Sequence, residues 1–600
     1  MDKKAFTLIE LLAVIVILGI LALIVTPILI NVVKDSNEKS YKLSADGYIS
    51  AVNDYILSNQ LDGKKVENGK YNIKNLDVKI SGKAPSKGSV EIYDEKVSSA
   101  QLLFDTYLVK YDGKKVTLTE KGCEKEATVN LVIGEKEYDN VAKVAKDDIE
   151  TEFNISDDIS DMTNIVCNNG VTISMNDNTL KLSDVYKDTN CTMSRSINDT
   201  FNNLDDTKNY ILMLKDEKIL KTLENKETKN VTIELNGKSI TASNVSVIHN
   251  LGTLSILNNS LNASSLNSNV ATIGAEKNSV LSLKNISVVS ENTDNKSSIC
   301  NKGKLEVKNS YIKGPYGIGC NDEAGAEINV QDSMIVATVK NGISFNETSF
   351  SENAPSGTIS SSEINGKNIA VAFVSTGTLS IESGKFNSET GNVIVNSNSG
   401  TININSGIYI SKNSNAIANF NSGTINIQQS NKSVYISSLA QIWRPAVLNS
   451  SSGKINIKGN KANDCTNNSE KTTSGICIYA EGSKDYTKNT SNGGIQNNST
   501  GNINVDGATI FGGNQGANNG SNGTLNIKNS NVSSGRAAIF NNGVGTINIC
   551  SSILSAPLLD IHNYGGGIIN YSNLNKDLKI YNPTNGTINS NYTGSCTEWL

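Results

Sequence analysis

The sequence has few of the side chains that recognise phosphate or ligate metal ions. Among 600 residues there are two histidines, His249 and His562, and three arginines, Arg195, Arg444 and Arg536. Bidentate clamps for phosphate and carboxylate groups rely on arginine. A net charge of −5 with a pI near 5.5 gives no excess of basic groups for binding a nucleic-acid backbone. We therefore expect no nucleic-acid partner.

Cysteine and proline are also sparse. The nine cysteines form no CxxC pair and no Cys/His cluster, so we expect neither a metal site nor a cofactor. Seven prolines, together with regularly spaced β-branched residues, argue against a disordered chain despite the abundance of asparagine and serine. A chain of this length is too long for one compact core and predicts several domains.

One long apolar segment is present, and it lies at the N-terminus. After Lys3 and Lys4, the run from Phe6 to Val33 is almost entirely apolar. About 20 such residues span a bilayer core as a helix. No small-residue cleavage site follows the run, as a secretory signal would require. The basic residues before it favour a cytoplasmic N-terminus. We predict a single-pass membrane helix at 6–33 with the remainder of the chain outside the cell.

A carboxylate lies near the start of this helix, where a charge in lipid needs a partner. The segment KKAFTLIELLAVIVILGILALIVTP resembles the N-terminus of type IV prepilins and type II secretion pseudopilins. The resemblance implies that prepilin peptidase cuts between Ala5 and Phe6, that Phe6 is then N-methylated, and that Glu10 pairs with the terminal amine of a neighbouring pilin subunit. Gly19 and Pro27 match the family's helix-weakening positions. Ala5 departs from the usual glycine, so slower cleavage is expected. The alternative is an uncleaved anchor with an incidental glutamate.

The next segment continues a helical pattern and then turns to strands. Residues 34–60 keep apolar side chains at helical spacing, namely Tyr41, Ala45, Tyr48, Ile49, Val52, Tyr55 and Ile56. Strand-like runs separated by turns follow: GKYNIKNLDVKI, GSVEIYDEKV, DTYLVKY and KKVTLTE. This order is similar to a pilin head domain. In residues 124–200, Cys167 and Cys191 flank two strand-like runs, and a disulfide between them would stabilise the unit by about 3 kcal/mol.

From about residue 231 to 590 the chain repeats a Gly-x-apolar-x-apolar unit, with most starts roughly 20–25 residues apart. The unit occurs as GTLSI at 252–256 and 377–381, GKLEV at 303–307, GTINI at 400–404, 423–427 and 545–549, GKINI at 453–457, GNINV at 501–505, GTLNI at 523–527, GIINY at 567–571 and GTINS at 586–590. This period predicts a single-stranded, right-handed parallel β-helix of about 14 or 15 rungs, ~70 Å long.

The alternation within each unit predicts which side chains face the core. Stacked rungs would align apolar ladders, here Ile402, Ile404, Ile425, Ile427, Ile455 and Ile457. An asparagine recurs before the glycine and is expected to hydrogen-bond along the axis: Asn250, Asn301, Asn321, Asn396, Asn419, Asn497, Asn541, Asn563 and Asn582.

Two more disulfides follow from this register. Cys300 and Cys320 both directly precede a repeat asparagine in consecutive rungs, so stacking would bring them within bonding distance. Cys465 and Cys477 share the longest insertion, 459–500, and can staple it. Cys123, Cys550 and Cys596 have no evident partner.

The expected organisation is mainly β. A leader at 1–5 precedes a transmembrane and filament-core helix at 6–33. A pilin-like α+β head spans 34–123, a small β linker 124–200 and the parallel β-helix 201–600.

Catalysis on the β-helix is weighed against binding. Polysaccharide-degrading β-helices need clustered carboxylates or a positioned base. The repeat region is poor in acids, and Asp322-Glu323 is its one adjacent acidic pair. We expect no enzyme. The favoured function is a minor or tip pilin whose β-helix is an adhesive or spacer outside the cell, with Trp443 and the polar faces as candidate glycan contacts. The alternatives are a membrane-anchored polysaccharide-degrading enzyme, and a component of DNA-uptake or type II secretion machinery.

Overall fold

The computed structural model describes residues 36–591, apart from 63, 65, 67, 74–75, 77, 81, 105–106, 121–126, 134–135, 145–149, 156, 178, 184–188, 293–295, 321–326, 348–353, 442, 483–492 and 575–576. These residues form two compact units. The first contains 36–157 and 171–191, and the second contains 158–170 and 192–591. The helix predicted at 6–33 lies outside the described residues.

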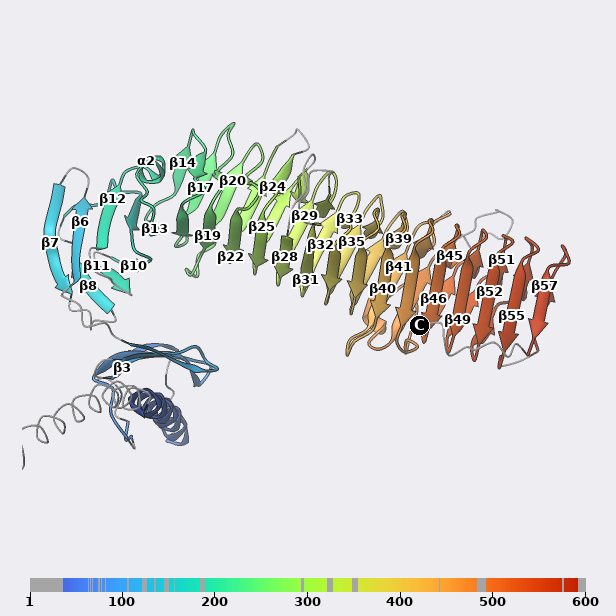
Figure 1. Cartoon of the computed structure of the whole chain (residues 1–600), viewed down its shortest axis with the longest axis horizontal. Helices are drawn as coiled ribbons and strands as arrows, with labels where there is room; N and C mark the ends of the chain where they lie inside the picture. The colour runs from blue at the N-terminus through green and yellow to red at the C-terminus, as the bar shows by residue number, and fades with distance from the viewer. Residues whose placement is uncertain are drawn as a thin grey trace, which may run out of the picture. The chain divides into compact units, whose positions relative to one another are not determined.

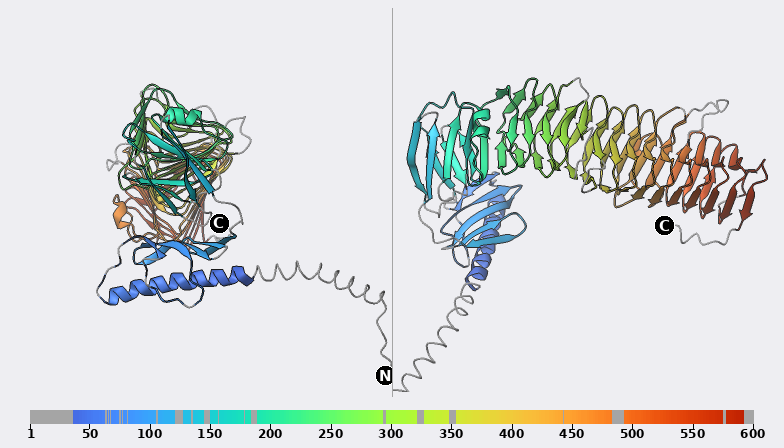
Figure 2. Two further views of the ribbon diagram at one scale, coloured as in Figure 1. Left: turned by 90° about the vertical axis from the view of Figure 1, so that its left-hand side faces the viewer. Right: turned by 45° about the horizontal axis from the view of Figure 1, so that its top comes forward.

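The first unit contains a helix over 36–61 and a five-stranded antiparallel sheet in sequential order (Figure 2). Its strands are β1 (Gly69–Asn72), β2 (Lys87–Tyr93), β3 (Lys96–Phe104), β4 (Tyr107–Tyr111) and β5 (Val116–Glu120). The apolar stripe of the helix packs on this sheet, as its spacing predicts. Tyr41, for example, contacts the rings of Phe104 and Tyr107, with centroids 5.9 and 5.1 Å away.

Shorter antiparallel elements follow. One is the pair β6 (Ala127–Ile133) and β7 (Lys136–Val144), and another is a three-stranded sheet of β8 (Glu150–Asn154), β10 (Thr172–Asn176) and β11 (Thr179–Ser183). β9 (Asn164–Cys167) belongs to the second unit, where it pairs antiparallel with the first strand of the β-helix. β12 (Thr189–Ser194) leads into the short helix α2 (Ile197–Asn202).

The second unit is a parallel β-helix of about 15 turns over residues 208–590 (Figure 1). Each turn contributes one strand to each of three parallel sheets, as the repeat predicts. The first sheet carries the Gly-x-apolar-x-apolar units and comprises β13 (Lys208–Met213), β16 (Asn230–Glu234), β19 (Thr253–Leu257), β22 (Val280–Lys284), β25 (Lys304–Lys308), β28 (Glu327–Gln331), β31 (Ser356–Ser360), β34 (Thr378–Ile381), β37 (Thr401–Ile404), β40 (Thr424–Gln428), β43 (Lys454–Lys458), β46 (Asn502–Asp506), β49 (Thr524–Lys528), β52 (Thr546–Cys550), β55 (Ile568–Ser572) and β57 (Thr587–Ser590).

The second sheet has 14 strands. They are β14 (Glu217–Ile219), β17 (Ser239–Ala242), β20 (Ser265–Ser268), β23 (Ser287–Ser290), β26 (Tyr311–Gly314), β29 (Met334–Ala337), β32 (Ser362–Gly366), β35 (Gly384–Ser388), β38 (Gly407–Ser411), β41 (Val434–Ser438), β44 (Ile476–Ala480), β47 (Thr509–Gly512), β50 (Asn531–Ser534) and β53 (Ile553–Ser555).

The third sheet has 15 strands. They are β15 (Leu223–Asn225), β18 (Ile248–Asn250), β21 (Ile273–Ala275), β24 (Ser297–Asn301), β27 (Tyr316–Ile318), β30 (Ile343–Asn346), β33 (Val371–Val374), β36 (Ile394–Asn396), β39 (Ile417–Asn419), β42 (Val447–Asn449), β45 (Gly493–Asn497), β48 (Gln515–Asn519), β51 (Ala537–Asn541), β54 (Leu559–Asn563) and β56 (Ile580–Tyr581). A 3₁₀ turn, η2 (Ser469–Lys471), lies in the insertion after β43.

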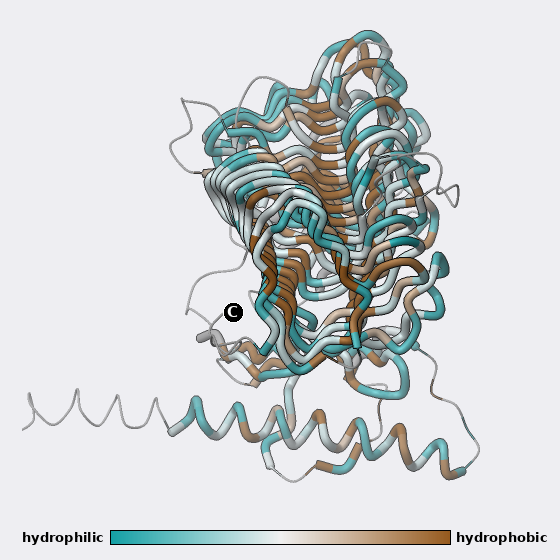
Figure 3. The backbone as a smooth tube through the Cα atoms, turned by 90° about the vertical axis from the view of Figure 1, so that its right-hand side faces the viewer, coloured by the Kyte–Doolittle hydropathy of each residue, from teal (hydrophilic) through white to brown (hydrophobic). Residues whose placement is uncertain are grey.

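Apolar ladders form the interior of the β-helix. Ile402 aligns with Ile425, which aligns with Ile455, and all three are fully buried. In Figure 3 apolar residues recur at matching places in successive turns. The predicted isoleucine ladders are therefore confirmed, and their burial provides most of the driving force for stacking the turns.

Buried asparagines form a second ladder at the corner between the third and first sheets. The Asn419 side-chain amide donates to Asn449 Oδ1 at 3.3 Å and to the carbonyl of Gly423 at 2.9 Å. The same position holds the buried Asn225, Asn250, Asn301, Asn396, Asn419, Asn449, Asn497, Asn519, Asn541 and Asn563 and the half-buried Asn582. This corner also explains the anchor glycine. A Cβ on Gly423 would lie 2.4 Å from Asn396 Nδ2, closer than atoms can pack.

The asparagine prediction was wrong in one turn. The register aligns Ile318 with Ile299, which places Cys320, and not Asn321, at the position equivalent to Asn301. Asn321 itself lies outside the described residues. The equivalent position in the next two turns holds Phe345 and Phe373, whose rings meet edge-to-face at 5.5 Å.

An outer asparagine ladder lines the first sheet. The central asparagine of each GTINI-type strand donates its amide to the asparagine one turn earlier, for example Asn456 to Asn426 at 2.9 Å and Asn526 to Asn504 at 2.7 Å. The series continues to Asn589. Stacked amides on a solvent-side face satisfy one another, so the repeat keeps an outward polar residue without leaving its amide unpaired.

The N-terminal end of the β-helix is covered by non-repeating elements. Ile197 and Phe201 of α2 pack into the interior core, and β9 pairs with β13 through Val166 and Ile211. Solenoid ends need such caps because the last turn otherwise exposes its apolar face.

Candidate functional site

The residues with the most specific predicted roles lie at the N-terminus. Ala5, Phe6, Glu10, Gly19 and Pro27 fall outside the described residues, so their roles in cleavage, methylation, assembly and helix flexibility remain predictions.

Among the residues that the structure describes, no helix is both long enough and apolar enough to span a membrane.

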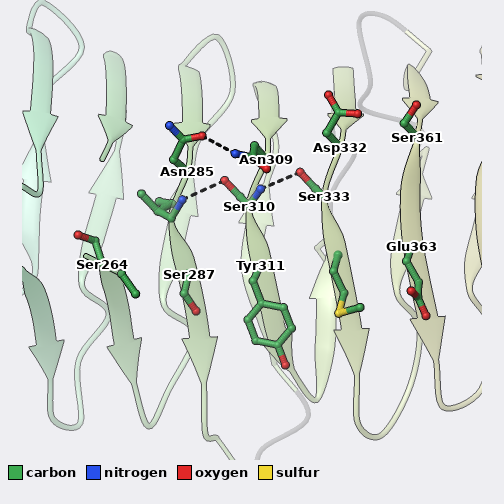
Figure 4. Close-up of a pocket in the computed structure, with 13 residues that line it drawn as sticks. Ser264, Asn285, Ser287, Asn309, Ser310, Tyr311, Asp332, Ser333, Ser361 and Glu363 are labelled. Atoms are coloured by element: carbon green, nitrogen blue, oxygen red, sulfur yellow. Dashed lines mark hydrogen bonds between the residues drawn. The ribbon is translucent and has the colours of Figure 1, made fainter. Parts of the chain in front are cut away.

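The β-helix carries a shallow groove of about 420 Å³ where the first sheet turns into the second (Figure 4). The corner residues Asn285, Asn309, Asp332 and Ser361 adopt left-handed backbone conformations, with φ between 47° and 58°. Asparagine and aspartate tolerate this conformation better than most residues. The side-chain amide of Asn309 donates to Asn285 Oδ1 at 2.8 Å, so neighbouring corners are linked.

A row of serines fixes these corners one residue further on. Ser310 donates its hydroxyl to the carbonyl of Lys308 at 2.8 Å, and the Ser310 N–H donates to Ser333 Oγ at 3.0 Å. Ser333 repeats the pattern with Ser362. Each serine thus satisfies a backbone carbonyl of its own turn and an amide of the turn before, which leaves the groove with a rigid polar wall.

The other wall of the groove is more adaptable. Tyr311, Met334 and Glu363 project from successive strands of the second sheet, and Met334 is 38 % exposed. An aromatic ring, a thioether and two carboxylates, those of Asp332 and Glu363, can contact a small polar ligand. Within the described ranges, no three His, Cys, Asp or Glu side chains converge to hold a metal ion.

The local sequence did not lead us to this groove, although a signal was present. The anchor unit is followed by Lys-Asn at 284–285 and 308–309 and by Gln-Asp at 331–332. A polar residue before an Asn or Asp at a constant offset marks a left-handed corner.

The cysteines are found in bonded pairs where the structure describes both partners. Cys300 bonds Cys320 with a Cα–Cα distance of 4.7 Å, and Cys465 bonds Cys477 at 5.2 Å. The Cys300–Cys320 bond was predicted, but the two cysteines do not occupy the same register position as expected. Cys300 aligns with Gly319 (φ +143°), so the bond runs diagonally to the next residue.

The remaining cysteines divide into two groups. Cys167, Cys191 and Cys550 are disulfide-bonded. Cys123 and Cys596 lie outside the described residues.

The two histidines occupy the same outward row of the third sheet, at opposite ends of the β-helix. His249 Nε2 lies 3.0 Å from Glu276 Oε1, and Lys302 Nζ lies 3.0 Å from the other oxygen. Partial burial raises the pKa of Glu276, but the hydrogen bonds from His249 and Lys302 outweigh it, so this pKa lies below its usual value. The group is a surface ion network.

Trp443 is 55 % exposed and, unusually for a tryptophan, has a left-handed backbone with φ 53°. It lies far from the groove in sequence, in the segment between β41 and β42. Trp443 is therefore not part of the groove lining.

Comparison with known proteins gives one positive finding. Residues 1–26 match the family model described as the prokaryotic N-terminal methylation motif. No curated protein matches the chain, and no solved structure matches it. The chain therefore carries a prepilin-type motif at its N-terminus and a parallel β-helix over 208–590, and the motif implies processing by a prepilin peptidase and assembly with other pilins.

Proposed function

We propose that this chain is a minor or tip pilin-like surface protein, whose β-helix serves outside the cell as an adhesive or spacer module. The observation that carries the proposal is the methylation motif at 1–26. A motif of this kind is followed by cleavage before Phe6, and it places Glu10 where a buried carboxylate needs the terminal amine of another subunit.

The first unit supports this proposal. A helix over 36–61 that buries one stripe on an antiparallel sheet is the arrangement expected for a pilin-like head. A β-helix of about 15 turns on every subunit would hinder close packing of N-terminal helices, which favours a sparse or terminal position in a filament.

The β-helix is proposed to bind or to space and not to catalyse. The groove contains carboxylates on successive turns, Asp332 at a corner and Glu363 on the second sheet, where their side chains join the polar lining. A membrane-anchored polysaccharide-degrading enzyme is the competing function, and assays for sugar release from soluble polysaccharides separate the two.

The decisive experiment is mass spectrometry of the mature N-terminus after co-expression with a prepilin peptidase. We expect loss of residues 1–5 and one added methyl group on Phe6. A matched Ala5→Gly variant should be cleaved faster, and Phe6→Asp should remain uncleaved.

Assembly is tested by Glu10→Ala, which should still be cleaved but should no longer co-purify with partner pilins. An intact leader in the mature protein, or full co-assembly of Glu10→Ala, would reduce the proposal to a tethered β-helix.

A further inference from the structure

Four residues of the third sheet form an outward row at the C-terminal end of the β-helix. Asn518, Phe540, His562 and Tyr581 are aligned on successive strands, from β48 to β56 (β51 is labelled in Figure 1). Their chain neighbours point the other way, because Ile539 and Ile561 belong to the interior core. Neighbouring members of the row are therefore about 4.8 Å apart along the axis.

The row contains a cluster of aromatic rings centred on His562. Its ring centroid lies 4.9 Å from that of Phe540, 5.7 Å from Tyr564 and 5.1 Å from Tyr581. The two tyrosines are 54 % and 51 % exposed. Six of the sixteen large apolar side chains exposed in the described part of the chain fall in this last stretch: Val544, Ile553, Leu558, Tyr564, Ile568 and Tyr581. These six side chains lie on all three sheets and at the corners between them, and Tyr564 and Tyr581 are the two that contact His562. Their half-exposed rings give the row an apolar surface to which a ligand can bind.

Two polar atoms in the row are buried without a hydrogen-bond partner among the residues that the structure describes. They are Asn518 Oδ1 and His562 Nε2, and their residues are only 3 % and 8 % exposed. Unpaired asparagine oxygens recur elsewhere in the described β-helix, for example at Asn419 and Asn541, whereas His562 Nε2 is the one imidazole nitrogen among these atoms. The imidazole is therefore the polar group in the row that most needs a ligand as partner.

His249 provides an internal comparison. It occupies the same row near the N-terminal end, and there the imidazole is paired with Glu276 at 3.0 Å. A histidine in this row can therefore have a hydrogen-bond partner in the fold. The neighbours of the His562 ring are aromatic side chains instead.

A ligand that fits this row must offer hydroxyl groups to the two polar atoms and a C–H face to the rings. We propose that Asn518, Phe540, His562, Tyr564 and Tyr581 bind a short neutral oligosaccharide. A pyranose ring stacks on the exposed tyrosines, and its hydroxyls hydrogen-bond to His562 Nε2 and Asn518 Oδ1. The biological setting rests on the proposed function outside the cell, but the binding itself does not.

The chemistry of the row argues for a neutral sugar. Burial, and to a lesser degree the nearby Arg536 charge, lower the pKa of His562, so its imidazole is neutral at pH 7. Asparagine, phenylalanine and tyrosine are also uncharged at that pH. An anionic ligand would need more cationic donors than this row offers. The half-exposed side chains of Tyr564 and Tyr581 contact the His562 ring and can change rotamer quickly, which gives a ligand access to that ring.

Histidine NMR provides a sensitive test, because the chain has only two histidines. Full-length protein in detergent, labelled at the histidine rings, is titrated with cellotetraose, laminaritetraose and chitotetraose in one arm and with lacto-N-tetraose in the other. The arms distinguish microbial from animal-cell glycans. We expect at least one saccharide to shift the His562 signal and leave the His249 signal in place, and calorimetry then gives its affinity.

Variants assign that binding to the row. Tyr581→Ala and Asn518→Ala should each weaken it by about tenfold or more, whereas the matched variant His249→Ala should leave it unchanged. Tyr564→Ala, at a 54 % exposed position, is a further variant that should fold.

Three results would overturn the proposal. They are no shift with any saccharide, undiminished binding in both Tyr581→Ala and Asn518→Ala, and a His562 signal that responds to protein concentration but not to sugar. None of these results depends on cleavage before Phe6, so failure here and failure of the pilin proposal are distinguishable.

Discussion

Two stretches of the β-helix solve the same packing problem differently. In the turns from Asn396 to Asn563, the corner before the anchor glycine is filled by asparagines that bond one another and the glycine carbonyls. In the preceding turns the same position holds Ala275, Asn301, Cys320, Phe345 and Phe373. The same register position thus accepts either a hydrogen-bonded asparagine or an apolar or disulfide-bonded side chain.

The difference shows what the corner requires. A side chain there must either satisfy the carbonyl that the anchor glycine presents or exclude water from it. Asparagine satisfies the carbonyl, while Phe345 and Phe373 fill the space and meet edge-to-face. Asparagine can recur in any number of successive turns, because each side-chain amide hydrogen-bonds to the asparagine of a neighbouring turn. Phenylalanine at this position requires neighbouring side chains whose size fits its ring.

The largest effect is expected from Phe373→Ala in the aromatic stretch. The ring is fully buried against Phe345, and its loss leaves a cavity that should cost about 3–5 kcal/mol. Because solenoid turns can unfold locally, hydrogen exchange of β33 and its neighbours is the measurement. Phe420→Ala, at a 43 % exposed position, is the matched control and should change little. An equal increase of hydrogen exchange in Phe373→Ala and Phe420→Ala would mean that packing at this corner does not stabilise the turns.

A smaller effect is expected from Asn449→Ala in the amide stretch. The variant removes the donor to the buried Asn497 Oδ1, and it removes one of two hydrogen bonds at the Gly453 carbonyl and at the Asn419 amide, which should cost about 1–3 kcal/mol. Increased exchange should be confined to β39, β42 and β45. Asn421→Ala, at an exposed turn, serves as control. If Asn449→Ala is as stable as the parent protein, the asparagine ladder does not stabilise the fold, and its role is to fix which residues align in successive turns.

The smallest effect is expected from a change of pH. It should alter the stability of the first turns of the β-helix but not that of the turns from Asn396 to Asn563. Burial raises the pKa of Glu234, and it likewise raises the pKa of Glu217, above the usual value near 4.5. A carboxyl with a raised folded-state pKa binds its proton more tightly when folded, so its stabilising contribution is complete below pH 4.5 and is lost as the pH rises through the folded-state pKa.

Exchange of β16 and β19, corrected for intrinsic rates, should therefore be slower at pH 5 than at pH 7.5. The strands from β36 to β42 should show no such change. Asp205 and Asp206, whose pKa values are lowered, act in the opposite sense but only below about pH 3.8. Glu234→Gln should abolish the difference, and a persistent difference in that variant would assign it to another group.

Most of the β-helix could be predicted from sequence because its signal is local and repeated. Residues two apart in GTINI reveal the inward isoleucines, and the period reveals that they stack. The position of Cys320 could not be predicted, since that turn is shorter and its register is set by Ile318 pairing with Ile299. Residues 158–170 gave no sign of joining the β-helix unit, because β9 reaches β13 across more than forty residues of intervening chain.

The surface features were harder to predict for a related reason. Corners such as Asn309 and Asp332, and the row from Asn518 to Tyr581, consist of residues far apart in the sequence that only the register brings together. A single repeat does not reveal which of its outward positions lacks a partner. That property appears only when every neighbour is placed, as the contrast between His249 and His562 shows.

The self-pairing of the outer amides has a consequence for how such a molecule can change over generations. Asn504, Asn526, Asn548 and Asn570 follow one another at a constant interval of 22 residues, and each meets an identical group above and below. Duplication or deletion of one 22-residue interval would again place asparagine next to asparagine where the chain is rejoined. The length of the β-helix can therefore change in steps of about 4.8 Å while both ends are kept. A gene segment built this way behaves as an extensible ruler.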